Sequence, residues 1–230
     1  MIIIHPSWES EIELNPDGIF TITVENPSLL AKYVMQLREQ LGGSDGFFAI
    51  YDGDTPIAMS HNVSLVVDPF SCSANEKSIL SSVDRAASAY AVSEQRYLDS
   101  NAVVSSLSRS VEDLLSEMDP LLEIDVPSYA AIMKIMNIHF VQSTSLVERL
   151  SLFLDASSKF CGTKVFIFIN LRSFIDGEVF QEFVKHITYH KYHVLFFESS
   201  YHPPMRCEGS MIVDNTLCEI RSSSGGECNI

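Results

Sequence analysis

In the first 70 residues, short apolar or alternating runs are separated by turn residues, which is the pattern of β-strands. Asn15-Pro-Asp-Gly18 is a strong turn signal between two of these runs, so we expect those two strands to form a hairpin. The runs that predict strands are Met1–His5, Glu11–Leu14, Ile19–Val24, Phe47–Tyr51 and Val63–Val67.

Two helical patterns accompany these strands. Asn26 and the proline after it suit a helix start, apolar residues recur on one face through Leu37, and Gly42 suits the helix end. Residues 75–118 contain neither Pro nor Gly, and apolar residues recur there at sevenfold spacing. This segment predicts one long helix, or two helices with a break near residues 99–101.

The last third predicts parallel sheet. Lys164–Asn170 and His193–Glu198 are continuous apolar strands, and the helix pattern over Asp176–His190 lies between them. A strand, a helix and a strand at this spacing form a βαβ unit. Two further helices are expected over 130–136 and 143–158.

Residues 211–220 predict a final strand or strand pair. The fold class is therefore α/β, with a head domain that contains a βαβ sheet and a helical segment inserted in the middle of the chain. We place the head at 1–71 and 161–220, the helical leg at 72–160, and a flexible tail at 221–230.

Composition narrows the class of protein. The chain has 15 Lys and Arg against 30 Asp and Glu, a net charge of −15, which argues against nonspecific coating of nucleic acid. Residues 156–207 are an exception, with 6 cations against 4 acids. Cysteines are scattered, and we expect Cys161 and Cys218 to be small buried residues. Without an apolar run of roughly 18 residues or a basic leader, a soluble cytoplasmic protein is expected.

Few sequence motifs indicate a catalytic or binding site. The phosphate loop G-x-x-x-x-G-K-[ST] and the nucleophile elbow G-x-S-x-G are both absent from the sequence. Glu182, His186 and His190 lie four residues apart on a predicted helix and could bind zinc, but a solvated helix face of mixed charge is favoured. No reaction can be assigned from these residues.

One acidic cluster and a set of basic residues are the remaining candidate binding sites. Four carboxylates within nine residues either lie on a solvated surface or bind a hard cation such as calcium; they are Glu117, Asp119, Glu123 and Asp125. Isolated lysines are usually ordinary surface residues, and a phosphate-binding surface would need symmetry to multiply them. The candidate cations are Lys134, Lys159, Lys164, Arg172, Lys185 and Lys191.

Several segments together resemble one known family. KVFIFIN, the amphipathic helix through Ile187, VLFFE and MIVDNTLCEI are similar to the Csn-two family of CRISPR-associated proteins from type II-A systems. The resemblance extends upstream to LEIDVPSYAAIMKIMNIHF (Leu122–Phe140) and weakly to TITVENPSLLAKYV (Thr21–Val34). It is poor over 75–118.

The resemblance implies an α/β head related to nucleotide hydrolases but without a phosphate loop, together with a helical leg. It implies a homotetrameric ring that binds the ends of double-stranded DNA in a basic channel, with calcium between head and leg. It also implies no catalytic activity, and a role in spacer acquisition beside the CRISPR integrase proteins and the effector nuclease.

The functional positions of the family can be assigned to residues of this sequence. Glu123 and Asp125 fall on acidic positions of the family, and Asp119 lies near another, which implies a calcium role for these three. Lys134 matches a family lysine and is the first candidate for the DNA channel. The other candidates for DNA contact are Lys159, Lys164, Arg172 and Lys185.

The sequence thus predicts a DNA-end-binding ring protein of antiviral defence that is not an enzyme and has no membrane partner. Two other interpretations stay open. One is a protein-interaction scaffold whose long helix docks partners without contacting DNA, and the other is a degenerate nucleotide-binding enzyme.

Overall fold

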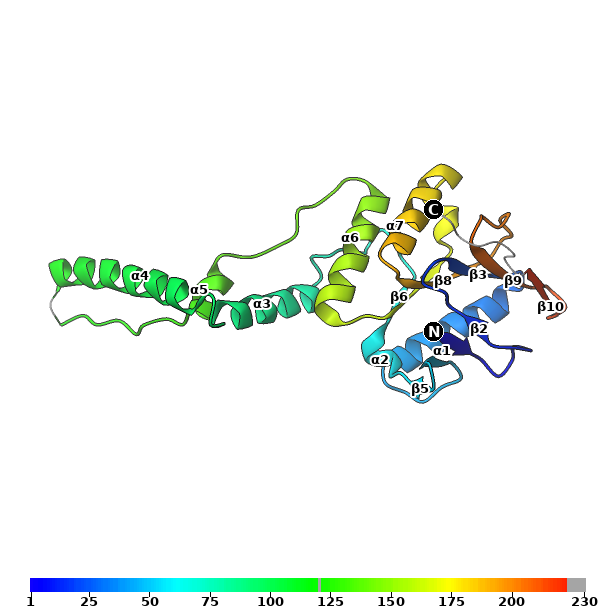
Figure 1. The fold of residues 1–230 in the computed structure, drawn as a ribbon, viewed down its shortest axis with the longest axis horizontal. Coiled ribbons are helices and arrows are strands. Elements are labelled where there is room, and N and C mark those ends of the chain that lie inside the picture. The colour runs from blue at the N-terminus through cyan, green and yellow to red at the C-terminus, as the bar shows by residue number, and fades with distance from the viewer. Residues whose placement is uncertain (120, 223–230) are drawn as a thin grey trace. The chain divides into compact units, whose positions relative to one another are not determined.

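The computed structural model describes residues 1–119 and 121–222 (Figure 1). The chain forms two compact units. Unit 1 consists of Met1–Ser73 and Ser143–Ile230, and unit 2 consists of Ala74–Gln142. The fold is mixed α/β, as the sequence predicted, with both sheets in unit 1.

The larger sheet of unit 1 has six strands in the order β10-β9-β3-β8-β7-β6. The neighbouring pairs β9–β3, β3–β8, β8–β7 and β7–β6 are all parallel, and β10 runs antiparallel to β9. Strand β3 comes from the first chain segment and lies between two strands of the second. The strands are β3 (Ile19–Val24), β6 (Val63–Val66), β7 (Val165–Ile169), β8 (His193–Glu198), β9 (Glu208–Val213) and β10 (Glu219–Ser222).

The smaller sheet is antiparallel, with the order β2-β1-β4-β5. Its strands are β1 (Ile2–Ile4), β2 (Ile12–Glu13), β4 (Ala49–Asp52) and β5 (Thr55–Pro56). The predicted hairpin is wrong, because β2 pairs with β1 while β3 lies in the other sheet. The turn at Asn15–Gly18 reverses the chain, but the almost wholly buried β3 requires neighbours on both sides.

Helices cover the sheets of unit 1, and three of them, α1, α6 and α7, begin with side-chain caps. Asn26 caps α1, as its sequence predicts, and Asp176 caps α7 between the parallel strands β7 and β8. The predicted βαβ unit is therefore confirmed. The helical elements of unit 1 are α1 (Pro27–Leu41), α2 (Met59–Asn62), α6 (Leu146–Ala156), a π-helical turn (Ser157–Cys161), a 3₁₀ turn (Leu171–Ser173) and α7 (Gly177–Tyr189).

The core of unit 1 lies on both faces of β7 and β8. Every residue of β7 is buried, and so are the last five residues of β8. Phe168 stacks on Phe196, and Phe180 and Phe183 of α7 pack edge-on against these rings. Burying such aromatic side chains contributes about 2–3 kcal/mol each, which fixes α7 on the sheet.

Unit 2 is helical, with α3 (Lys77–Ala91), α4 (Tyr97–Met118) and α5 (Tyr129–Ile135). The second of the two sequence alternatives is correct, since two helices replace one long helix. The break lies at 92–96 rather than at 99–101, and Ser100 belongs to α4, where its hydroxyl donates to the carbonyl of Ala91. No helix of the described residues has the length and apolarity needed to cross a membrane.

Two smaller expectations are corrected. Cys161 and Cys218 are exposed rather than buried, because one ends the π-helical turn and the other lies in the turn before β10. Arg221 and Ser222 belong to β10 rather than to a tail, and the rest of the predicted tail lies outside the described residues.

Candidate DNA interface and metal-ligating residues

Lys134, the first DNA candidate, is exposed on the short helix α5 of unit 2. Ser128 caps this helix by accepting from the N–H of Ala131, which holds Lys134 in the last turn. Residues 126–147 contain this lysine and no acidic residue, although the chain is strongly acidic overall. The local charge around Lys134 along the chain is therefore positive.

A second acid-free stretch covers residues 156–175 and contains three of the DNA candidates. Lys159 lies in the π-helical turn with its ammonium 5.3 Å from the centre of the Phe160 ring. Lys164 precedes β7, and its Nζ lies 3.1 Å from Oδ2 of Asp52. Both side chains are exposed, so an exposed ion pair of this kind leaves Lys164 available to an anion.

Arg172 differs from the other candidates because its charge is paired inside the protein. Its side chain is only 9% exposed, and Nη1 lies 3.0 Å from Oε1 of Glu208. The guanidinium also lies over the Phe180 ring and donates to the carbonyl of Pro203. Arg172 and Lys164 lie beyond opposite ends of β7, a strand of five residues that is about 16 Å long at ~3.3 Å per residue.

Lys185 is exposed on α7 beside a depression of about 170 Å³. Arg206 and Asp17 line the same depression. The structure thus brings together two cations, of which the sequence analysis had selected only Lys185. Arg206 was missed because its loop carries no regular pattern that would place it beside α7.

Glu198 is a buried carboxyl near this ion pair. It ends β8, is 0% exposed, and accepts from the backbone N–H of Arg172 through Oε1. The pKa of Glu198 is raised to about 7, chiefly by burial, with a smaller contribution from the nearby Glu208 and with Arg172 opposing the change. Open α/β sheets usually bind ligands at the carboxyl ends of their strands, but these internal contacts occupy that position beside β7 and β8.

At the helix starts near this edge of the sheet, capping side chains already bond to some of the free N–H groups. Oδ1 of Asn26 accepts from the N–H groups of Ser28 and Leu29 at the start of α1. Oδ1 of Asp176 accepts from the N–H of Val179 at the start of α7. Phosphate binding at a helix start uses free N–H groups, so a phosphate at either start would have to displace the capping side chain from the N–H groups that it occupies.

The predicted calcium ligands Asp119, Glu123 and Asp125 are exposed and lie after α4 in a segment without regular secondary structure. Oδ1 of Asp119 accepts from the N–H of Leu121. Their oxygen donors suit a hard cation. Within the described residues, however, these three carboxylates do not form a cluster with ligand atoms close enough to share one ion.

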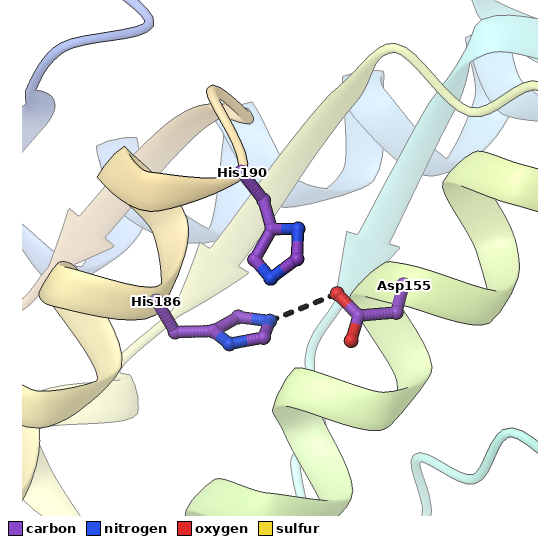
Figure 2. Close-up of side chains that lie close together, drawn as sticks. All are labelled: Asp155, His186 and His190. Carbon is purple, nitrogen blue, oxygen red and sulfur yellow. Dashed lines mark hydrogen bonds and ion pairs between the residues drawn. The ribbon is translucent and has the colours of Figure 1, made fainter.

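The cluster that the described residues do form joins Asp155 of α6 with His186 of α7 and His190, the residue that directly follows α7 (Figure 2). Nε2 of His186 lies 2.8 Å from Oδ1 of Asp155, and the hydroxyl of Tyr192 donates to the same oxygen at 2.7 Å. Burial and the neighbouring carboxylate raise the pKa of Tyr192, which keeps this hydroxyl protonated. Glu182, the third residue of the sequence hypothesis, is exposed and absent from the cluster.

Residues 40–217 match the family described as CRISPR-associated protein (Cas_Csn2), which is most of the chain. No curated protein matches it. One similar solved structure is described as "An inward-facing conformation of a putative metal-chelate type ABC transporter". Its TM-score is 0.43 at 13% identity, over 94% of this chain and 75% of that chain, and so weak a likeness carries no functional conclusion.

Proposed function

This chain belongs to the Cas_Csn2 family of CRISPR-associated proteins, and from that premise we propose that it is a non-catalytic protein that binds double-stranded DNA ends during spacer acquisition. The family resemblance expected from the sequence is confirmed by the match over residues 40–217, and this match carries the proposal. In it, unit 1 is the head, unit 2 is the leg, and a homotetrameric ring encloses the DNA.

In this proposal, unit 1 is a head domain related to nucleotide hydrolases that lacks their phosphate-binding site. The capped starts of α1 and α7 support this, because Asn26 and Asp176 already accept from three of their N–H groups. A protein that binds no nucleotide there has no obvious source of energy for moving DNA. Passive enclosure of a DNA end is consistent with that arrangement.

Local charge supports DNA binding in spite of the net charge of −15. The acid-free stretches 126–147 and 156–175 contain exposed lysines, among them Lys134, Lys159 and Lys164. A symmetric ring would repeat each lysine once per subunit and so concentrate these cations around its channel. Such contacts would be made to phosphates, which gives binding without base specificity.

Calcium at Asp119, Glu123 and Asp125 is part of the same proposal. A bound calcium ion would supply positive charge to these exposed carboxylates, which otherwise repel one another. We also expect contacts with the CRISPR integrase proteins and the effector nuclease. The DNA binding itself is assigned to the lysines.

The experiment compares a linear duplex with a covalently closed circle of the same sequence. A closed ring must thread onto an end, so we expect the linear duplex to bind and the circle not to bind. Affinity for the linear duplex should fall by orders of magnitude from about 50 to 200 mM salt, since bound phosphates release counterions. Lys134→Ala should weaken binding and reduce the salt slope by about one for each copy that contacts DNA.

Lys32→Ala is the matched control, because Lys32 is exposed on α1 and outside the proposed interface. Equal binding to circle and linear duplex would contradict the ring. Failure to bind any duplex, with calcium or with a chelator, would contradict DNA binding and favour the scaffold. If calcium strengthens binding, the double substitution of Glu123 and Asp125 by Ala should remove that effect.

A further inference from the structure

The facing surfaces of α6 and α7 in unit 1 carry a histidine pair and a carboxylate that the proposed DNA binding does not use (Figure 2). We propose that Asp155, His186 and His190 form a binding site for one divalent transition-metal ion, with zinc as the expected occupant. The three residues each offer one ligand atom, and these atoms all lie within 4.8 Å of one another.

The helical spacing of the two histidines brings their rings to the same side of α7. His186 and His190 are four residues apart, and their ring centroids lie 4.4 Å from each other. Two nitrogen ligands of one tetrahedral zinc lie about 3.3 Å apart, since each zinc–nitrogen bond is about 2.0 Å long. The ligand atoms of the side chains in Figure 2, all within 4.8 Å of one another, would therefore have to approach by at most about 1.5 Å to share the ion.

Tyr192 provides the outer contact that metal-ligating carboxylates usually have. Its hydroxyl donates to Oδ1 of Asp155, the oxygen that also accepts from His186. Its ring stacks on His190 at an interplanar angle of 9°. Tyr192 thus orients one ligand through a hydrogen bond and another through its ring, which makes it a positioning residue of the site.

The donor set selects the class of metal. Imidazole nitrogens favour zinc and its neighbours over calcium or magnesium, which prefer oxygen ligands alone. Three protein ligands leave one tetrahedral position open, and His190 is exposed, so solvent can supply and remove the ion. Because Asp155 comes from α6, His186 from α7 and His190 from the C-cap of α7, the ion would cross-link two helices of unit 1.

The Asp155–His186 contact could also be an ordinary ion pair with no metal function. His190→Gln distinguishes a metal site from a simple ion pair, because the substitution keeps the Asp155–His186 pair and removes only a metal ligand. The purified protein, residues 1–230, would be titrated with ZnCl₂ against a chromophoric chelator, and CoCl₂ would report four-coordinate geometry through its visible absorption. We expect one zinc per wild-type chain, none for His190→Gln, and an affinity about 10–100-fold weaker for Tyr192→Phe.

His139→Gln is the matched control, since His139 is an exposed histidine of unit 2. The wild type and this control should also gain the same thermal shift with zinc, while His190→Gln gains none. Circular dichroism without metal verifies that each variant is folded. Equal zinc binding by wild type and His190→Gln, or no binding by either, would overturn the site.

Discussion

Glu198 ends β8 with its side chain fully buried, and this environment raises its pKa from 4.5 to about 7. The folded protein therefore holds this proton more tightly than the unfolded chain does. The free energy of unfolding falls as pH rises from 4.5 towards 7, because the folded state must then bury a carboxylate. Below 4.5 the carboxyl is neutral in both states and this penalty is absent.

Glu198→Gln removes the charge and should remove this pH dependence. The stability of the variant relative to wild type should increase by about 2 kcal/mol between about pH 5 and pH 8, as one pKa unit is worth about 1.4 kcal/mol. Urea unfolding at both pH values measures the change. Glu182→Gln, on the exposed face of α7, should show no such difference. A constant offset for Glu198→Gln at both pH values would contradict the buried-charge explanation.

Single residues show where sequence reasoning ends. The spacing of His186 and His190 was visible in the sequence, but their third partner was not. Asp155 precedes His186 by 31 residues on another helix, and only the packing of α6 against α7 brings them together. The pairing of Arg172 with Glu208 likewise depends on a contact between distant segments, so an apparent surface cation is a nearly buried one.

At the level of elements, sequence signals predicted the structure correctly where the interactions involve residues close together in the chain. Helix α1 begins after Asn26 and ends before Gly42, as predicted, because caps act on their own helix. The turn at Asn15–Gly18 was also recognised, but a turn does not specify which strands pair. The break between α3 and α4 was placed several residues too late, since Ser100 lies inside α4 and its hydroxyl donates to the carbonyl of Ala91 at the end of α3.

Asn26→Ala tests the contribution of that cap. Losing the side-chain acceptor leaves two N–H groups at the start of α1 to water, which should destabilise unit 1 by about 1 kcal/mol. The midpoint of urea unfolding measures this. Gln181→Ala, an exposed position on α7, is the control and should change stability by less than about 0.5 kcal/mol. Equal stability of Asn26→Ala and wild type would show that the cap is dispensable.

At the level of the whole molecule, unit 1 is built from two separated chain segments. The first segment contributes β3 and β6, and the second contributes β7 to β10. Strand β3 pairs with β8 on one side and with β9 on the other, so the two segments interleave. The sequence predicted the parallel pair β7 and β8 from their shared apolar pattern. It could not predict that β3 would enter between strands of the second segment, because the register depends on tertiary packing.

This interleaving predicts that the chain can be cut in unit 2 without separating its halves. Leu121 and Leu122 are exposed and outside regular secondary structure, so a site-specific protease sequence inserted after Leu122 should be tolerated. After complete cleavage, residues 1–122 and 123–230 should run as two bands on a denaturing gel but elute together from a sizing column. The buried strand contacts of β3 with β8 and β9 hold them. Urea should separate the fragments, whereas separation in native buffer would mean that these contacts are too weak to hold unit 1 together.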